Sequence, residues 1–153
     1  MNCSGCDTTA LYHAWGLLEA KGGRREVAGD IFRRGVELGL QNKEVLGVGV
    51  GVGFLLHSLG MLLLDDRDWP GAQEVFRRGV KLFPAHSHML LGMALVMMRT
   101  GDHRAARKYF RQSVDADSMH LHAWQSWAVA EKQLGNVELA RMLFRQVAVI
   151  IIE

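Results

Sequence analysis

The chain has 153 residues, long enough for one domain with a sizeable core, and 49% of them are hydrophobic, which excludes a wholly disordered protein. Its 18 basic and 16 acidic side chains leave a net charge of +2, too small by itself to require a polyanionic partner. No run reaches about 18 consecutive apolar residues, so we expect no membrane span.

The first residues carry a C-x-x-C pair, Cys3 and Cys6. A structural zinc site would need two further ligands, and His13 is the only nearby candidate. A redox pair would need a strand before it and a helix after it, and the sequence around this pair does not give that context convincingly. We therefore predict a disordered terminus over residues 1–7, with no metal and no cofactor.

A pattern of aromatic and small residues recurs four times along the rest of the chain. Each copy has a phenylalanine with an alanine four positions earlier, and successive phenylalanines are 44, 34 and 34 residues apart. Units of this length are typical of two short antiparallel helices, which must stack on their neighbours to bury an apolar face. The first and last copies also have a tryptophan seventeen positions before the phenylalanine. The pattern consists of Trp15, Ala28 and Phe32; Ala72 and Phe76; Ala106 and Phe110; and Trp127, Ala140 and Phe144. We expect all six of these aromatic side chains to be buried.

A glycine followed by a capping residue marks the middle of two units, at Gly101–Asp102 and Gly135–Asn136. Glycine ends a helix readily, and Asp or Asn begins the next one well. In the other two units Gly23 precedes Arg24, and Arg67 precedes Asp68. We expect first helices near 9–21, 54–65, 87–99 and 120–133, and second helices near 25–38, 70–82, 103–115 and 137–150. The corresponding repeats span about 9–39, 54–84, 87–118 and 120–150.

The ten extra residues between the first two units include an alternating Gly-Val segment over 47–53. Glycine at every second position weakens a helix, and the spacing fits no phosphate-binding loop. We predict a poorly ordered loop insertion over about 43–53, whose deletion leaves stability equal or higher.

The first and last units carry a sharper signature. The last has Ala-Trp-Gln-Ser-Trp-Ala-Val-Ala-Glu over 123–131 and Ala-Arg-Met-Leu-Phe-Arg over 140–145, and the first has Ala-Trp-Gly-Leu-Leu-Glu over 14–19. With Trp15, Glu19, Trp127 and Glu131 in place, this pattern resembles the HAT (half-a-tetratricopeptide) repeat, and most of all the plastid HAT proteins of plants and green algae. The resemblance implies an RNA-binding protein that acts in message processing, stabilisation or translation, and a chloroplast location.

The second and third units depart from that signature. Leu59 and Met93 replace the tryptophan, and Leu63 and Met97 replace the glutamate. The arginine found at positions 107 and 141 is replaced in the first and second units by Gly29 and Gln73. Overall, the chain is expected to be all-α: a right-handed α-solenoid of about four TPR- or HAT-like repeats, with eight helices in a single domain over 1–153.

Arginines stand directly after the phenylalanines of the second helices. Repeated once per unit, they would form a basic stripe that could contact successive phosphates of a nucleic-acid strand. The alternative is a solvated helix face with no ligand. Residues on the first helices could contact RNA from the concave groove, where amides read base edges. The candidate RNA-binding residues are Arg33, Arg77, Arg111, Arg145, Arg34, Arg78, Lys21, Arg99, Gln125 and Lys132.

Two classes of function are consistent with this pattern. One is single-stranded RNA binding, and the alternative is a TPR-type scaffold that holds a peptide in its groove. No nucleophile, base and orienting group cluster in the sequence, so we expect no enzyme activity. Glu131 is expected to pair with Arg141 on the facing helix. The apolar segment 147–152 is expected to dock a protein partner or further repeats.

Overall fold

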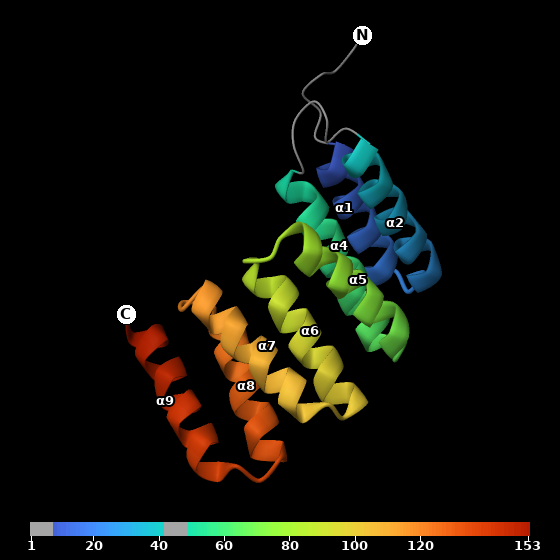
Figure 1. Ribbon diagram of the computed structural model, residues 1–153. Coiled ribbons are helices and arrows are strands. Elements are labelled where there is room, and N and C mark those ends of the chain that lie inside the picture. Colours follow the sequence, from blue (N-terminus) through green and yellow to red (C-terminus); the bar gives the residue numbers. More distant parts are fainter. Residues whose placement is uncertain (1–7, 42–48) are drawn as a thin grey trace. The chain divides into compact units, whose positions relative to one another are not determined.

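The computed structural model describes residues 8–41 and 49–153, and over these residues it contains eight α-helices and no strand (Figure 1). The predicted terminus 1–7 and most of the predicted loop lie outside the described residues. Helix α4 begins four residues earlier than expected and α2 ends three later, while the other helix ends agree within two residues. The helices are α1 (Thr8–Lys21), α2 (Arg25–Gln41), α4 (Val50–Asp65), α5 (Trp69–Leu82), α6 (Ser87–Thr100), α7 (His103–Ala116), α8 (Leu121–Gln133) and α9 (Val137–Ile152).

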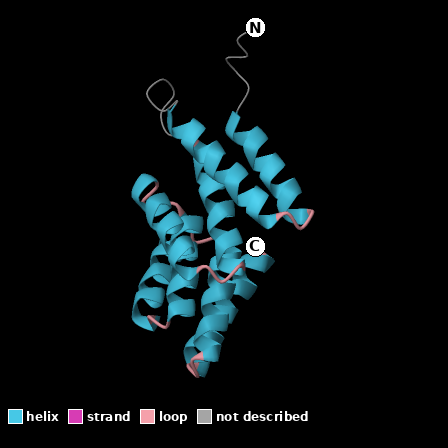
Figure 2. Ribbon diagram, turned by 90° about the vertical axis from the view of Figure 1, so that its right-hand side faces the viewer, coloured by secondary structure: helices cyan, strands magenta, loops and turns pink. Residues whose placement is uncertain are grey.

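The chain divides into two compact units, residues 1–82 and 83–153. In the first unit α1 packs on α2, α4 contacts both of them, and α5 packs on α4. In the second unit α6 packs on α7, α8 contacts both, and α9 packs on α8. Within each repeat, a short loop joins the two helices (Figure 2). Each unit therefore consists of two helix-turn-helix repeats, and the expected single domain over 1–153 stays a prediction.

The turns inside the repeats form as the sequence pattern predicts. Gly23, Gly101 and Gly135 have φ values of 83°, 88° and 83°, a conformation that glycine adopts without a Cβ clash. Arg67 takes the same place in the second repeat with φ of 62°. After the turn, the Asp102 carboxylate accepts a hydrogen bond from the Ala105 amide at 3.1 Å and caps α7.

In the first two repeats, the phenylalanine of the second helix packs against a glycine of the first helix. A Cβ at Gly16 would overlap the ring of Phe32, and a Cβ at Gly60 would overlap the ring of Phe76. Both rings are fully buried. Sequence reasoning noted the alanine of each second helix but missed this glycine, sixteen positions before the phenylalanine, which lets the two helices approach closely.

Two of the six aromatic residues expected to be buried are not. Trp15 is 47% exposed and Phe144 is 41% exposed, whereas Trp127 is 6% exposed. Trp127 is covered by α7 of the preceding repeat. Trp15 lies on α1 and Phe144 on α9, and in the described part of the chain no helix precedes α1 or follows α9 to cover them. The pattern predicts the position of each side chain within its own repeat, but burial also needs the neighbouring repeat.

The predicted loop was wrong for residues 50–53, which form the first turn of α4. Val52 is buried against Gly39 of α2, and a Cβ at Gly51 would overlap the Thr9 side chain of α1. The glycines thus allow α4 to begin in close contact with α1 and α2. This tertiary packing outweighs their low helix propensity, so deletion across this turn should destabilise the first unit.

A candidate binding groove in the second unit

The first helices of the two repeats in the second unit form the walls of a groove. A cavity of about 480 Å³ lies between α6 and α8 and is closed by one residue from each second helix. Its apolar lining comes from all four helices of the unit: Leu95, Met98, Phe110, Val129, Ala130 and Phe144. Its polar lining comes from α6 and α8: Arg99, His122, Gln125, Ser126 and Gln133.

The groove combines apolar lining residues with polar, mildly basic ones. None of its lining residues is acidic, and Arg99 makes no ion pair within the described part of the chain. Two of the ten candidate RNA-binding residues, Arg99 and Gln125, line this groove. An apolar cavity with a few amides and one free guanidinium is the kind of surface that holds a peptide side chain and orients its backbone.

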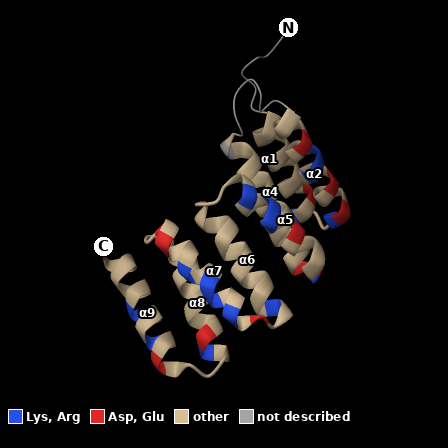
Figure 3. Ribbon diagram, in the orientation of Figure 1, with Lys and Arg blue, Asp and Glu red and all other residues tan. Residues whose placement is uncertain are grey.

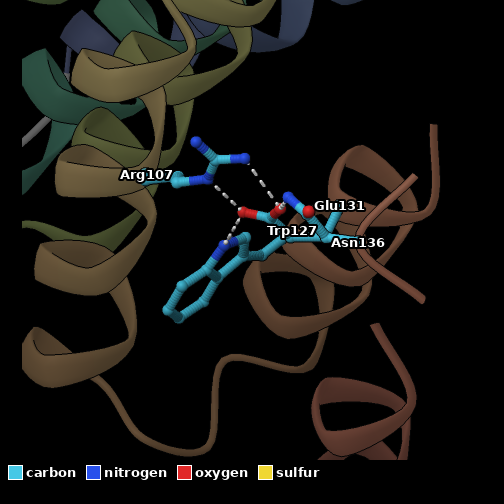
Figure 4. A network of polar contacts seen from close by, with 4 residues as sticks. All are labelled: Arg107, Trp127, Glu131 and Asn136. Carbon is cyan, nitrogen blue, oxygen red and sulfur yellow. Dashed lines mark hydrogen bonds and ion pairs between the residues drawn. The ribbon is translucent and has the colours of Figure 1, made fainter. Parts of the chain in front are cut away.

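A polar network fixes α8 beside the groove (Figure 4). Arg107 of α7 donates to both carboxylate oxygens of Glu131, from Nε at 2.7 Å and from Nη2 at 3.1 Å. Trp127 Nε1 donates to the same carboxylate at 3.2 Å, and Asn136 Nδ2 donates at 2.6 Å. Burial would raise the pKa of Glu131, but these hydrogen bonds hold the pKa below its ordinary value, so the carboxylate is charged.

The expected pairing of Glu131 with Arg141 is therefore wrong. Arg107 reaches Glu131 from the preceding repeat, whereas Arg141 pairs with Glu138 one turn earlier on its own helix at 2.6 Å. The contact from α9 comes instead from Asn136 at the start of that helix, which donates to the Glu131 carboxylate. Sequence spacing places Arg107 and Arg141 at the same position of successive repeats, and only the packing of α7 on α8 decides between them.

A second buried polar cluster joins the start of α6 to the end of α7 and the start of α8. The Ser87 and Ser113 hydroxyls each donate to the other residue's backbone carbonyl at 2.8 Å. His120 Nδ1 lies 2.5 Å from Ser87 Oγ, and the His120 and His88 ring centroids are 4.2 Å apart. Burial, followed by the nearby His88, lowers the pKa of His120 to about 4. Sequence reasoning missed this cluster. Serine is a common surface residue, so Ser87 and Ser113 give no sequence signal of a buried polar site.

Three of the six candidate arginines on the second helices form ion pairs with acidic neighbours. In the first unit Arg33 pairs with Asp30, Arg77 with Glu74 and Arg78 with Glu37. Basic and acidic segments accordingly occur together on α2, α5 and α9 in Figure 3. These pairs leave little net positive charge for a phosphate backbone.

The remaining candidates are dispersed. The Arg111 guanidinium lies 5.9 Å from the centroid of the Trp127 ring. Lys21 and Lys132 are exposed in the last turns of α1 and α8 and do not line the groove. Arg34 and Arg145 are exposed on the second helices of the first and last repeats.

Most of the structural signature residues are buried, the exceptions being Trp15, Phe144 and Glu19. Glu131 is buried, and so are the alanines of the pattern, Ala28, Ala72, Ala106 and Ala140. Glu19 is partly exposed and pairs with Arg24, whose hydrogen bond is the main reason that the pKa of this carboxyl lies below its usual value.

Over the described residues no group of three or more His, Cys, Asp or Glu side chains is placed to hold a metal ion. No helix among them has the length and apolarity needed to cross a bilayer.

The helix-turn-helix units, the glycine turns and the groove define an all-helical repeat protein, and comparisons identify its class. The sequence matches the tetratricopeptide repeat family over residues 57–118 and 91–150. These matches cover more than half of the chain, which therefore belongs to the tetratricopeptide repeat (TPR) family.

Solved structures share the fold. MamA 41-end from Desulfovibrio magneticus RS-1 has a TM-score of 0.71 and 14% sequence identity, over 95% of this chain and 76% of that one. YrrB, described as a TPR protein with an unusual peptide-binding site, has a TM-score of 0.67 and 18% identity, over 95% of this chain and 70% of that one. At these identities the likeness concerns the fold alone. No curated protein sequence matches the chain.

Proposed function

We propose that this protein is a protein-interaction module that binds a peptide segment in the groove of its second unit. The observation that carries the proposal is the cavity of about 480 Å³ with its apolar and amide lining and no acidic lining residue. Membership of the TPR family supports it, as does the likeness to YrrB, whose own description names a peptide-binding site.

The lining also favours one kind of peptide. Val129 offers exposed apolar surface to a large aliphatic or aromatic side chain. Arg99 and His122 line the groove without an acidic neighbour in the lining, so a carboxylate beside that anchor would be favoured.

A selection experiment tests the proposal. A random dodecapeptide phage library is selected on the purified chain, and the selected peptides are measured by fluorescence anisotropy. We expect Val129→Glu, which places a charge in the apolar lining, to weaken binding by at least about tenfold. The matched control is Met119→Glu, since Met119 is a similarly exposed apolar residue of the same unit that does not line the groove. Equal binding by both variants would place the peptides elsewhere and refute the proposal.

Single-stranded RNA binding by the arginines of the second helices is the other candidate. It derives from the resemblance to HAT repeats, and so does the chloroplast location. Both stay predictions. The ion pairs of Arg33, Arg77 and Arg78 favour the peptide proposal over RNA.

A further inference from the structure

The junction between α7 and α8 shows how one repeat of this chain receives the next. Trp127 stacks on Phe110, with ring centroids 6.2 Å apart and an angle of 4° between the planes. The Arg111 guanidinium lies near the same indole, and Arg107 forms its two hydrogen bonds with Glu131. Helix α7 thus contributes Arg107, Phe110 and Arg111 to the junction. Helix α8 contributes Trp127 and Glu131, which are four residues apart.

Helix α1 carries the same Trp–Glu pair as α8, and no described helix of a preceding repeat packs on it. Trp15 and Glu19 have the spacing of Trp127 and Glu131, and Trp15 Nε1 donates to Glu19 Oε1 at 3.2 Å, the same distance as in the Trp127–Glu131 bond. Arg24 contacts the other oxygen of Glu19, in the position that Asn136 takes on Glu131. The bidentate arginine from a preceding second helix is the one element that Glu19 lacks among the described residues.

The apolar surface around Trp15 is correspondingly uncovered. Leu11, Trp15 and Leu18 follow one another at helical spacing on α1 and are all exposed. Their equivalents on α8 are Ala123, Trp127 and Ala130, which are all buried. Three exposed large apolar side chains in one stripe are typical of a protein–protein interaction surface.

Helix α9 presents the opposite surface. Arg141, Phe144 and Arg145 occupy the positions of Arg107, Phe110 and Arg111. Phe144 is 41% exposed where Phe110 is buried, and Arg141 reaches only a carboxylate of its own helix. The chain therefore carries both halves of the α7–α8 junction a second time, on two different helices.

The other repeats show that this pairing is specific. Arginine occurs at the position of Arg107 only there and at Arg141, and glutamate occurs at the position of Glu131 only there and at Glu19. The first two repeats have Gly29 and Gln73 in place of the arginine, and the second and third have Leu63 and Met97 in place of the glutamate. Where the second helix of a repeat has the uncharged Gly29 or Gln73, the first helix of the next repeat has the uncharged Leu63 or Met97. Arg107 is instead followed by Glu131 in the next repeat. This leaves Arg141 of α9 and Glu19 of α1 as the remaining complementary set.

We propose that two copies of this chain associate head to tail, with α1 of one copy packing on α9 of the next as α8 packs on α7. In that contact Arg141 of one copy binds Glu19 of the other, and Trp15 covers Phe144 beside Arg145. The two surfaces are different, so each added copy still offers a free α1 and a free α9. Association of this heterologous kind continues beyond a dimer until a ring closes.

Sedimentation velocity of the full chain, from low micromolar to millimolar concentration, measures the association. We expect species larger than a dimer to grow with concentration. Tryptophan fluorescence should shift to shorter wavelength at the same time, because the half-exposed Trp15 becomes buried. The shift should be smaller in Trp15→Phe. A wild-type chain that stays monomeric, or stops at a dimer, over the whole range overturns the proposal.

Charge reversal identifies the residues. We expect Glu19→Arg alone and Arg141→Glu alone to weaken self-association by at least about tenfold, because like charges then face each other across the contact. Mixing the two variants in equal amounts should restore it, since every contact in the mixture can pair opposite charges. The matched control is Arg34→Glu, an exposed arginine of α2 outside both surfaces, which should associate as the wild type does.

Two outcomes of the charge-reversal series overturn the proposal: undiminished association by the single variants, and failure of the mixture to associate although both variants are helical by circular dichroism. If either reversal unfolds the chain, Glu19→Gln and Arg141→Gln replace it. These variants remove the charge without repulsion, and we still expect them to weaken association.

Discussion

Arg67 has a backbone conformation that the other three repeats assign to glycine. Its φ of 62° is the only positive value at a non-glycine residue in the described part of the chain. A side chain in this region costs on the order of 1 kcal/mol through the clash of Cβ with the backbone. We expect Arg67→Gly to stabilise the first unit by about 0.5–1 kcal/mol, measured as a shift of the urea unfolding midpoint. A destabilised variant would mean that the entropy of the added glycine in the unfolded chain exceeds the strain that it relieves.

Two tryptophans at the same position of different repeats should contribute very differently to stability. Trp127→Ala should lower the free energy of unfolding by about 3–5 kcal/mol, since Trp127 is buried against Phe110 and its indole donates to Glu131. Trp15→Ala should cost clearly less, about 1–2 kcal/mol in the dilute monomer, because nearly half of the side chain is already in water. Chemical unfolding at low micromolar concentration checks both, and equal losses would contradict the structure.

At the scale of a helix, the start of α4 depends on glycine at position 51. Gly51→Ala would improve helix propensity by up to about 1 kcal/mol, yet its Cβ would overlap Thr9. Overpacking of this kind typically costs about 1–3 kcal/mol, so we expect net destabilisation. The matched control is Gly49→Ala, where a Cβ meets nothing within 4 Å and stability should change by less than about 0.5 kcal/mol. A more stable Gly51→Ala variant would show that α4 does not pack on α1 as described.

The cluster at the start of α6 and α8 makes the second unit sensitive to acid. The pKa of His120 is lowered to about 4 in the folded chain, mainly by burial, from the ordinary value of 6.5 for a histidine. Because the unfolded chain binds the proton more tightly, stability falls as the pH drops below about 6.5 and levels off below about 4. The neighbouring charges are those of His86, His88, His122 and Asp117, of which the histidines lower the pKa and Asp117 raises it.

The size of this effect follows from the shift in pKa. Between about pH 7.5 and pH 5, His120 should account for a loss on the order of 2 kcal/mol in the free energy of unfolding. His120→Asn should be less stable at neutral pH but should show a flatter dependence on pH. Urea unfolding at several pH values measures both, and a variant with the wild-type slope would assign the acid sensitivity to other groups.

At the scale of the whole molecule, the distribution of charge limits RNA binding. Four arginines that each neutralise one phosphate of a single strand would give a slope of log affinity against log salt of about −3. With Arg33 and Arg77 already paired to carboxylates, we expect a shallower slope and no binding to a labelled single-stranded oligonucleotide at physiological salt. Binding that persists there, with a slope that flattens by about one half to one unit in Arg111→Gln, would favour RNA over a peptide.

The local structure follows closely from the sequence. The spacing of the phenylalanines, the glycine turns and the capping residues predicted eight helices, most with bounds correct within two residues, because helix formation, termination and capping depend on residues a few positions apart. Gly16 and Gly60, which let paired helices approach closely, stand at the same offset of sixteen residues before Phe32 and Phe76, so the repeat pattern contains their positions as well.

The tertiary structure alone decided which of these residues are covered and which charges meet. Trp15 and Trp127 occupy the same position of their repeats, yet only Trp127 is covered by a helix of the preceding repeat. Glu131 had two arginines at equivalent positions, and the packing of α7 selected Arg107. The first turn of α4 formed against local propensity, because burial of Val52 against Gly39 is a contact with a distant segment. Burial and ion pairing depend on contacts with the neighbouring repeat. The repeat pattern defines the residues within one unit, but it does not determine which residues of the neighbouring unit they contact.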